Sequence, residues 1–148
     1  MPKVGSCRRA WHLVVTLNGI RIKMDNKEFS EGLEKRTRKF AVRIIRLSTE
    51  LPNTPESRVI RYQLTKAGSS VGANYREANR SRSQADFYNK IKISESEASE
   101  TQYWLQVIVE ADLLPWERIK SDYDEISELL AIFTSIGQAR KAGRKRQL

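Results

Sequence analysis

The sequence is poor in the residues that build disulfides, metal centres and catalytic triads. It has one cysteine, Cys7, and one histidine, His12. A single cysteine excludes an internal disulfide and a zinc site built from cysteines. Because His12 precedes the helical pattern described below, no Ser-His-Asp or Cys-His arrangement is available within the helices. The paired Glu-x-x-His motifs of di-iron bundles and the glycine loops that bind phosphates are absent too. We therefore expect no catalytic residues, no metal site and no cofactor, and predict that the protein is not an enzyme.

Long apolar runs are also absent. No stretch approaches the roughly 18 to 20 apolar residues that a membrane-spanning helix requires. The short run that follows Arg8 and Arg9 resembles the start of a signal peptide, but His12 and Asn18 interrupt it and no small-residue cleavage site follows. We expect a soluble, cytoplasmic protein with no membrane partner.

No window of five to eight residues alternates apolar and polar side chains with the β-branched enrichment of a strand, so no sheet is expected. From residue 29 onward, apolar residues instead recur at spacings of three and four, which places them on one face of a helix. The pattern predicts four helices, whose apolar stripes are Phe29, Leu33, Phe40, Ile44, Leu47 and Leu51; Ile60, Leu64, Ala67, Val71, Asn74 and Ala78; Phe87, Ile91, Ser94, Ala98, Thr101, Leu105 and Ile108; and Tyr123, Ile126, Leu130 and Phe133.

Prolines and helix-capping residues mark the ends of these helices. Pro52 ends the first, and Thr54 followed by Pro55 starts the second. Capping boxes at 83–86 and 121–124 predict the starts of the third and fourth helices, and Pro115 follows the end of the third near Leu113.

Four helices with short connections predict an all-α fold, an antiparallel up-down-up-down four-helix bundle. We assign residues 28–138 to this bundle and 139–148 to a basic C-terminal tail. Residues 1–27 form an N-terminal extension that we expect to be disordered or loosely packed, because residues 1–23 lack helical periodicity and Met24 offers a second start. Ordered packing of Trp11 and Leu13 on the core would refute this.

Six small residues in a row, 68–73, lie in the second helix, and the third helix carries Ser94, Ser96, Ala98 and Ser99. Small side chains on facing helices predict a close approach of the two backbones. The alternative is that Gly68 and Gly72 interrupt two shorter helices.

Charge is unevenly distributed. The chain has 27 Lys and Arg against 18 Asp and Glu, a net charge of +9, yet residues 93–130 hold ten acidic and two basic side chains. This predicts a basic face from the second helix and the start of the third, and an acidic face from the end of the third and the start of the fourth. Such faces can meet head to tail in a ring or filament. The alternative is two solvated faces without a partner.

Four runs of the sequence resemble a known family. The runs Ser69–Ala78, Ala85–Phe87, Lys90–Ile93 and Glu100–Leu105, in this order and separation, resemble the 23S ribosomal RNA intervening-sequence protein family, also called the four helix bundle protein family, over residues 28–140. The resemblance implies a ring of five up-down-up-down bundles, a homopentamer. Some members are encoded inside insertions in ribosomal RNA genes, and a similar bundle binds reverse transcriptase and nucleic acid in diversity-generating retroelements. For most members the activity is unknown.

The resemblance also places family hallmarks at Asn74, Glu77, Glu100, Tyr103 and Trp104. Asn74 lies on the apolar stripe, so we expect it to bond across to the third helix and fix register. Glu77 can pair with Arg80 or with an arginine of a neighbouring subunit, or serve in binding. One of Tyr103 and Trp104 should face away from the core as an interface residue, the alternative for Trp104 being partial burial under the fourth helix.

The function predicted from these features is nucleic-acid binding. The candidate residues are basic and cluster on the second helix, its junction with the third and the tail: Arg58, Arg61, Lys66, Arg76, Arg80, Arg82, Lys90, Lys92, Arg140, Lys141, Arg144, Lys145 and Arg146. Repeated around a ring, they would hold RNA or DNA backbone with a steep salt dependence and no strong sequence specificity. The alternatives are a scaffold that binds a protein partner, and a basic surface that is merely solvated.

Overall fold

The computed structural model describes residues 14–17, 20–23 and 26–145. The elements in order are β1 (Val14–Leu17), β2 (Ile20–Lys23), α1 (Asn26–Thr49), α2 (Pro55–Asn79), α3 (Gln84–Glu110) and α4 (Trp116–Lys145). The chain divides into two units, residues 1–33 and 34–148. The predictions made for residues 1–13, including Trp11 and Leu13, lie outside the described residues.

A β-hairpin forms within the first unit. β1 and β2 pair antiparallel, with Val14 opposite Lys23 and Leu17 opposite Ile20. The expectation of no sheet is therefore wrong for residues 14–23. The intervening Asn18-Gly19 is a dipeptide that favours two-residue hairpin connections. Each strand has four residues, fewer than the five to eight over which alternation of apolar and polar side chains was expected to indicate a strand.

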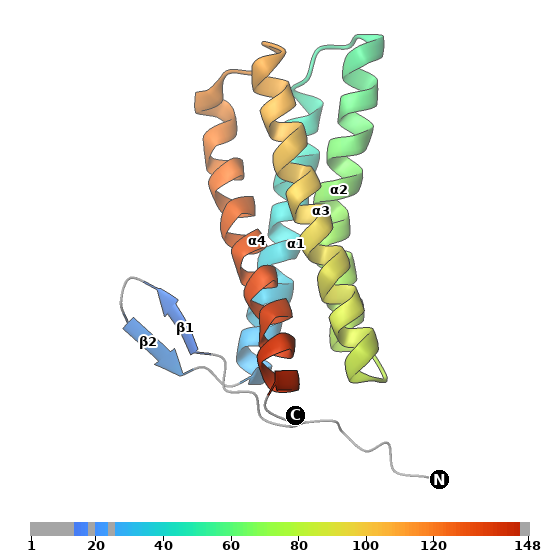
Figure 1. Cartoon of the computed structure of the whole chain (residues 1–148). Coiled ribbons are helices and arrows are strands. Elements are labelled where there is room, and N and C mark those ends of the chain that lie inside the picture. The colour runs from blue at the N-terminus through green and yellow to red at the C-terminus, as the bar shows by residue number, and fades with distance from the viewer. Residues whose placement is uncertain (1–13, 18–19, 24–25, 146–148) are drawn as a thin grey trace. The chain divides into compact units, whose positions relative to one another are not determined.

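The second unit consists of helices, as predicted, and is consistent with a four-helix bundle. The α1–α2 and α3–α4 connections lie at one end of the helices and the α2–α3 connection at the other (Figure 1). Among the described residues, no helix is both long and apolar enough to cross a bilayer.

Local capping signals correctly located the starts of α2 and α3. The Thr54 hydroxyl accepts a hydrogen bond from the Ser57 amide at 3.2 Å, and the Ser83 hydroxyl accepts one from the Asp86 amide at 3.1 Å. Each bond satisfies one of the amides that a helix start leaves without an intrahelical partner.

The end of α3 and the start of α4 were predicted wrongly. α4 begins at Trp116 rather than at 121. Asp112 adopts a left-handed backbone conformation with φ of 55° and donates its amide to the Val109 carbonyl, while the Leu113 amide bonds to the Ile108 carbonyl. This is a Schellman motif. It ends α3 at Glu110, three residues before the predicted end, so that the chain enters α4 earlier.

α4 also continues beyond the predicted bundle boundary at residue 138. Its backbone is helical to Lys145, through seven residues of the segment assigned as a tail. Alanine and basic residues favour this continuation, because alanine has the highest helix propensity and cations at a C-terminus interact favourably with the helix dipole.

The core is formed by the predicted stripes, with a few additions. Tyr75 of α2, which was not predicted, is buried and packs edge to face on Phe133 of α4 with ring centroids 5.5 Å apart. The predicted residues that are buried are Leu33, Phe40, Ile44, Leu47, Leu51, Leu64, Ala67, Val71, Ala78, Ile91, Ser94, Ala98, Thr101, Leu105, Ile108, Ile126 and Phe133.

The backbones of α2 and α3 approach closely, as predicted, and the two glycines of α2 bring its backbone close to α1 as well. A Cβ atom added at Gly68 would lie 2.8 Å from Cγ2 of Ile44, and one added at Gly72 would lie 2.9 Å from Oγ1 of Thr37. Both glycines lie within the unbroken α2, so the alternative of two short helices is wrong.

A buried hydrogen bond between α2 and α3 is made by Ser94, and not by Asn74. The buried Ser94 hydroxyl donates to the Val71 carbonyl at 3.0 Å. The Asn74 amide instead donates to the Ser70 carbonyl of its own helix at 2.9 Å. The prediction that Asn74 bonds across to α3 is therefore wrong, because the half-buried amide reaches a carbonyl one turn earlier in α2.

Candidate nucleic-acid interface

Charged residues are sorted along the length of the bundle. The end that carries the α2–α3 connection, here called the basic end, holds the first half of α1, the last part of α2 and the start of α3 (Figure 1). Its exposed cations are Lys35, Arg38, Lys39, Arg76, Arg80, Arg82 and Lys92. At the opposite end, residues 97–112 of α3 and its connection contain four acids and no Lys or Arg. The predicted basic and acidic faces are therefore closer to two ends.

A groove between α1 and α2 opens at the basic end. Ala41, Ser69, Gly72 and Ala73 line it with small side chains, and Arg38 and Arg76 contribute one cation from each helix. Glu34 also lines this groove, but its carboxylate accepts a hydrogen bond from the Asn79 amide at 2.8 Å and lies 3.8 Å from Arg80. The cations on either side are thus left facing solvent.

Some of the predicted nucleic-acid residues are free to bind. The Arg58, Arg76 and Arg82 side chains are exposed and form no ion pair or side-chain hydrogen bond with the described residues. Lys66 is exposed as well. The pKa of Glu97 is raised, because burial and the nearby charge of Glu100 outweigh the opposite effect of the Lys66 charge.

Others are engaged within the subunit. Arg61 donates from Nε to the Ser48 carbonyl at 2.9 Å and from Nη2 to the Leu51 carbonyl at 2.8 Å. It therefore satisfies carbonyls that the end of α1 would leave unpaired. This assigns Arg61 a structural role.

Glu77 also finds its partner inside the subunit. Its carboxylate lies 2.5 Å from Nζ of Lys90 on α3, and this pairing raises the pKa of Lys90. Within the subunit, the partner of Glu77 is therefore Lys90 rather than Arg80. Lys92 pairs with Glu95 one turn later at 2.9 Å, although Lys92 remains largely exposed.

Sequence reasoning missed the contribution of α1. Lys35, Arg38 and Lys39 are exposed at the basic end, next to the α2 cations. A signal was present, because residues 35–46 contain six basic side chains and no acid. Acidic residues before residue 35 and after residue 46 lower the net charge of the wider stretch around this segment, so the run of cations is not apparent there.

The C-terminal basic residues share the same end of the bundle. Arg140, Lys141, Arg144 and Lys145 belong to the last turns of α4, where the backbone is helical. Their side chains lie outside the described part of the chain, as does Arg146.

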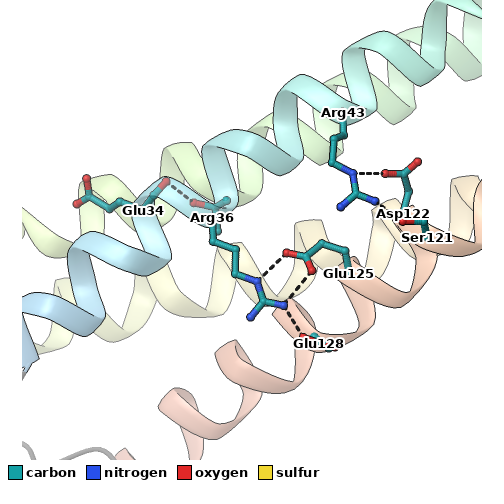
Figure 2. Close-up of polar contacts among 8 residues, drawn as sticks. Glu34, Arg36, Arg43, Ser121, Asp122, Glu125 and Glu128 are labelled. Carbon is teal, nitrogen blue, oxygen red and sulfur yellow. Dashed lines mark hydrogen bonds and ion pairs between the residues drawn. The ribbon is translucent and has the colours of Figure 1, made fainter. Parts of the chain in front are cut away.

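Three acids of α4 pair inside the subunit with arginines of α1 (Figure 2). Arg36 forms a two-pronged pair with Glu125 at 2.7 and 2.9 Å, and its Nη2 also lies 2.5 Å from Glu128. The hydrogen bonds from Arg36 lower the pKa of the Glu125 carboxyl. These α4 acids are therefore not free to form the acidic face that the sequence suggested.

A second set of pairs surrounds Asp122, whose side chain is almost fully buried. Arg43 Nε lies 2.7 Å from Oδ1 in an ionic contact that lacks hydrogen-bond geometry, and Arg118 Nη1 lies 3.6 Å from Oδ2. Arg43 also donates to the Ser121 hydroxyl at 2.8 Å, and Arg118 pairs with Glu50 at the end of α1. A buried carboxylate requires such compensation.

An aromatic pair projects from α3 at the end opposite the basic end. Tyr103 is 56% exposed, which confirms that one of the two aromatics faces away from the core. Trp104 is half-buried and donates from its indole nitrogen to Glu100 at 3.2 Å. The two rings meet edge to face with centroids 5.0 Å apart. In the described part of the chain, no group of three or more His, Cys, Asp or Glu could hold a metal ion.

Comparison with known proteins identifies the family to which these helices belong. Residues 33–135 match the 23S rRNA-intervening sequence protein family. The chain belongs to this family. The match extends from α1 into α4 and so includes the groove, the α1–α4 ion pairs and the aromatic pair.

A solved structure supports this assignment. The chain is 35% identical to a protein with unknown function from the S23 ribosomal protein family of Bacteroides thetaiotaomicron, whose crystal structure was determined at 1.70 Å resolution. The similarity covers 71% of this chain and 97% of that one, with a TM-score of 0.67. A comparison with curated proteins found no match.

Proposed function

We propose that this member of the 23S rRNA-intervening sequence protein family is a non-catalytic nucleic-acid-binding protein, an antiparallel up-down-up-down bundle that assembles into a ring of five subunits. The observation that supports it most directly is the basic end. There Lys35, Arg38 and Lys39 of α1 lie beside Arg76, Arg80 and Arg82 at the end of α2, and nearby acids such as Glu34 and Glu77 already have partners.

Such a surface suits the phosphate backbone rather than the bases. Cations that neutralise phosphates release condensed counterions, and the resulting binding is insensitive to sequence. Groove-flanking arginines such as Arg38 and Arg76 can each donate to a phosphate in a forked geometry. The helices carry no base-reading motif, so both RNA and DNA would bind through their backbones.

A ring strengthens this binding through multivalency. Subunits arranged side by side with their bundle axes aligned would bring all the basic ends to one rim. Each subunit then needs only a few phosphate contacts, because further subunits bind at the high effective concentration set by the first.

The proposal is tested by salt-titrated binding of a structured RNA and of a single-stranded DNA. We expect binding at low salt that weakens steeply as salt rises. Replacing Arg38, Arg76 and Arg82 together by glutamine should reduce the salt slope by about 0.7 per lost contact to a single strand. The matched control is Lys120→Gln, an exposed cation of α4 outside the basic end.

Two results would contradict the proposal. If neither polymer binds at low salt, the protein-scaffold alternative takes its place. If a chain ending at residue 139 loses all binding, the last turns of α4 and the residues after them carry the interaction, and the helical basic end does not.

A further inference from the structure

Two exposed patches with apolar centres lie on different helices of the bundle. The first patch, here called the α1–α2 patch, centres on Val42, Ile45 and Tyr62, which are 42%, 46% and 65% exposed. Arg46 and Arg58 are exposed one turn from Val42 and Tyr62 respectively. Tyr62 and Arg58 also line a shallow groove between the two helices.

The second patch, here called the α3 patch, has the opposite charge. Tyr103 and the half-buried Trp104 form its aromatic centre, and Glu97 and Glu100 lie one to two turns before them. No cation occurs between residues 97 and 112. Protein interfaces characteristically combine an apolar or aromatic centre with a polar rim, and opposite rim charges favour one partner and orientation.

We propose that these two patches form the seam between copies of the chain, the α1–α2 patch of one subunit receiving the α3 patch of the next. The inference rests on the ring of the proposed function and adds where its subunits meet. Because the two patches differ, the contact is heterologous, and each subunit uses both in a closed ring.

The positions of the patches favour a ring over a filament. The second half of α1, the first half of α2 and the second half of α3 all lie at the end away from the α2–α3 connection (Figure 1). Both patches are therefore at similar heights along the bundle. Neighbours joined in this way stand side by side with little offset, which leaves the basic ends together on one rim.

Two single variants test the seam: Tyr62→Glu in the α1–α2 patch and Tyr103→Arg in the α3 patch. Both side chains are mostly exposed, so we expect unchanged helical circular dichroism. Light scattering coupled to size exclusion should report a multimer for the wild type and a single chain for each variant. The matched control is Ala131→Glu, at an exposed residue of α4 outside both patches, which should still assemble.

Mixing the two variants gives a sharper result. Each retains one intact patch, so an equimolar mixture should form a complex of two chains, and it grows larger only if the introduced acid and the introduced arginine pair across the two altered patches. If both variants remain assembled, or if the mixture forms no heterodimer, the seam lies elsewhere and our assignment is wrong. Self-dimers of either variant would show an isologous contact and would also overturn it.

The seam and the proposed function can fail separately. If the wild type is a single chain throughout, the ring itself is wrong, whatever its affinity for RNA. If the wild type assembles, nucleic-acid binding by monomeric Tyr103→Arg should weaken about 100-fold or more through the loss of multivalency. Unchanged assembly in the variants together with normal salt-dependent RNA binding would remove the seam and leave the nucleic-acid function standing.

Discussion

The contact between Gly68 of α2 and Ile44 of α1 yields a prediction that opposes simple helix propensity. Gly68→Ala should stabilise an isolated helix by about 1 kcal/mol. In the bundle, however, the new Cβ would lie 2.8 Å from Cγ2 and 3.1 Å from Cβ and Cγ1 of Ile44. The contacted atoms are the stiff part of a β-branched side chain, which cannot rotate away in a helix. Ile44 is also fully buried, so relief requires α1 to shift.

Overpacking a core by one methyl group costs about 1–3 kcal/mol. After the propensity gain is subtracted, we expect Gly68→Ala to lower the free energy of unfolding by about 1 kcal/mol. The control is Gly137→Ala in α4, where an added Cβ meets no atom within 4 Å. That substitution should raise the free energy of unfolding by about 0.5–1 kcal/mol.

Urea denaturation followed by helical circular dichroism measures both changes. Protein concentration must be fixed, because the proposed assembly would make the transition concentration-dependent. Ile44→Ala removes the two γ carbons and leaves only the Cβ contact at 3.1 Å, so Gly68→Ala should cost less in that background. If Gly68→Ala lowers the free energy of unfolding as much in the Ile44→Ala background as in the wild type, the close approach of α1 and α2 is refuted. It is also refuted if Gly68→Ala alone stabilises the protein as much as Gly137→Ala.

Three further predictions concern single contacts. Asp112→Gly should stabilise by about 1 kcal/mol, because glycine adopts the left-handed conformation without a Cβ penalty; lower stability in thermal denaturation would contradict this. Glu125→Gln should cost about 1–2 kcal/mol at neutral pH. The pKa of Glu125 is lower in the folded than in the unfolded state, so its stabilising effect is complete above the unfolded pKa and is lost as the pH falls through the folded pKa. The control is Asp124→Asn at an exposed residue, which should cost under about 0.5 kcal/mol. If the effect of Glu125→Gln persists in acid, the ionic origin is excluded. Ser94→Ala should cost about 1 kcal/mol by removing the buried hydrogen bond that Ser94 adds to the Val71 carbonyl of α2, compared with little for the exposed Ser135→Ala; equal urea midpoints would refute this.

Helix starts could be predicted from sequence because their signals are local. Thr54 and Ser83 each accept a hydrogen bond from an amide three residues later, so the relevant groups are adjacent in the chain. The end of α3 was harder to predict, because its left-handed position holds Asp112 rather than the usual glycine. The β-hairpin was missed for a different reason, namely strands of four residues each.

The candidate site was predicted less well, because a cation is free only if no acid on another helix reaches it. Lys90 resembled a surface lysine in sequence, yet it pairs with Glu77 across the α2–α3 contact. Arg36 and Glu125 are 89 positions apart and form a two-pronged pair. Such partners depend on which faces of the helices meet. The periodicity of a single sequence gives the faces of each helix but not their neighbours.

The arginines of α1 show how one basic segment can serve both the fold and a binding surface. Arg36 and Arg43 are seven residues apart, which places them on one face of the helix, and both pair with acids of α4. Lys35, Arg38 and Lys39 lie on the remaining surface and are exposed. Three acids of α4 are therefore paired with the inner arginines, whereas Lys35, Arg38 and Lys39 form no ion pair with the described residues. Arg46, Arg58 and Lys66 are also exposed, toward the other end of the bundle. The outer cations of α1 lie beside those at the end of α2, and it is this combination of two helices at the basic end that would suit a phosphate backbone.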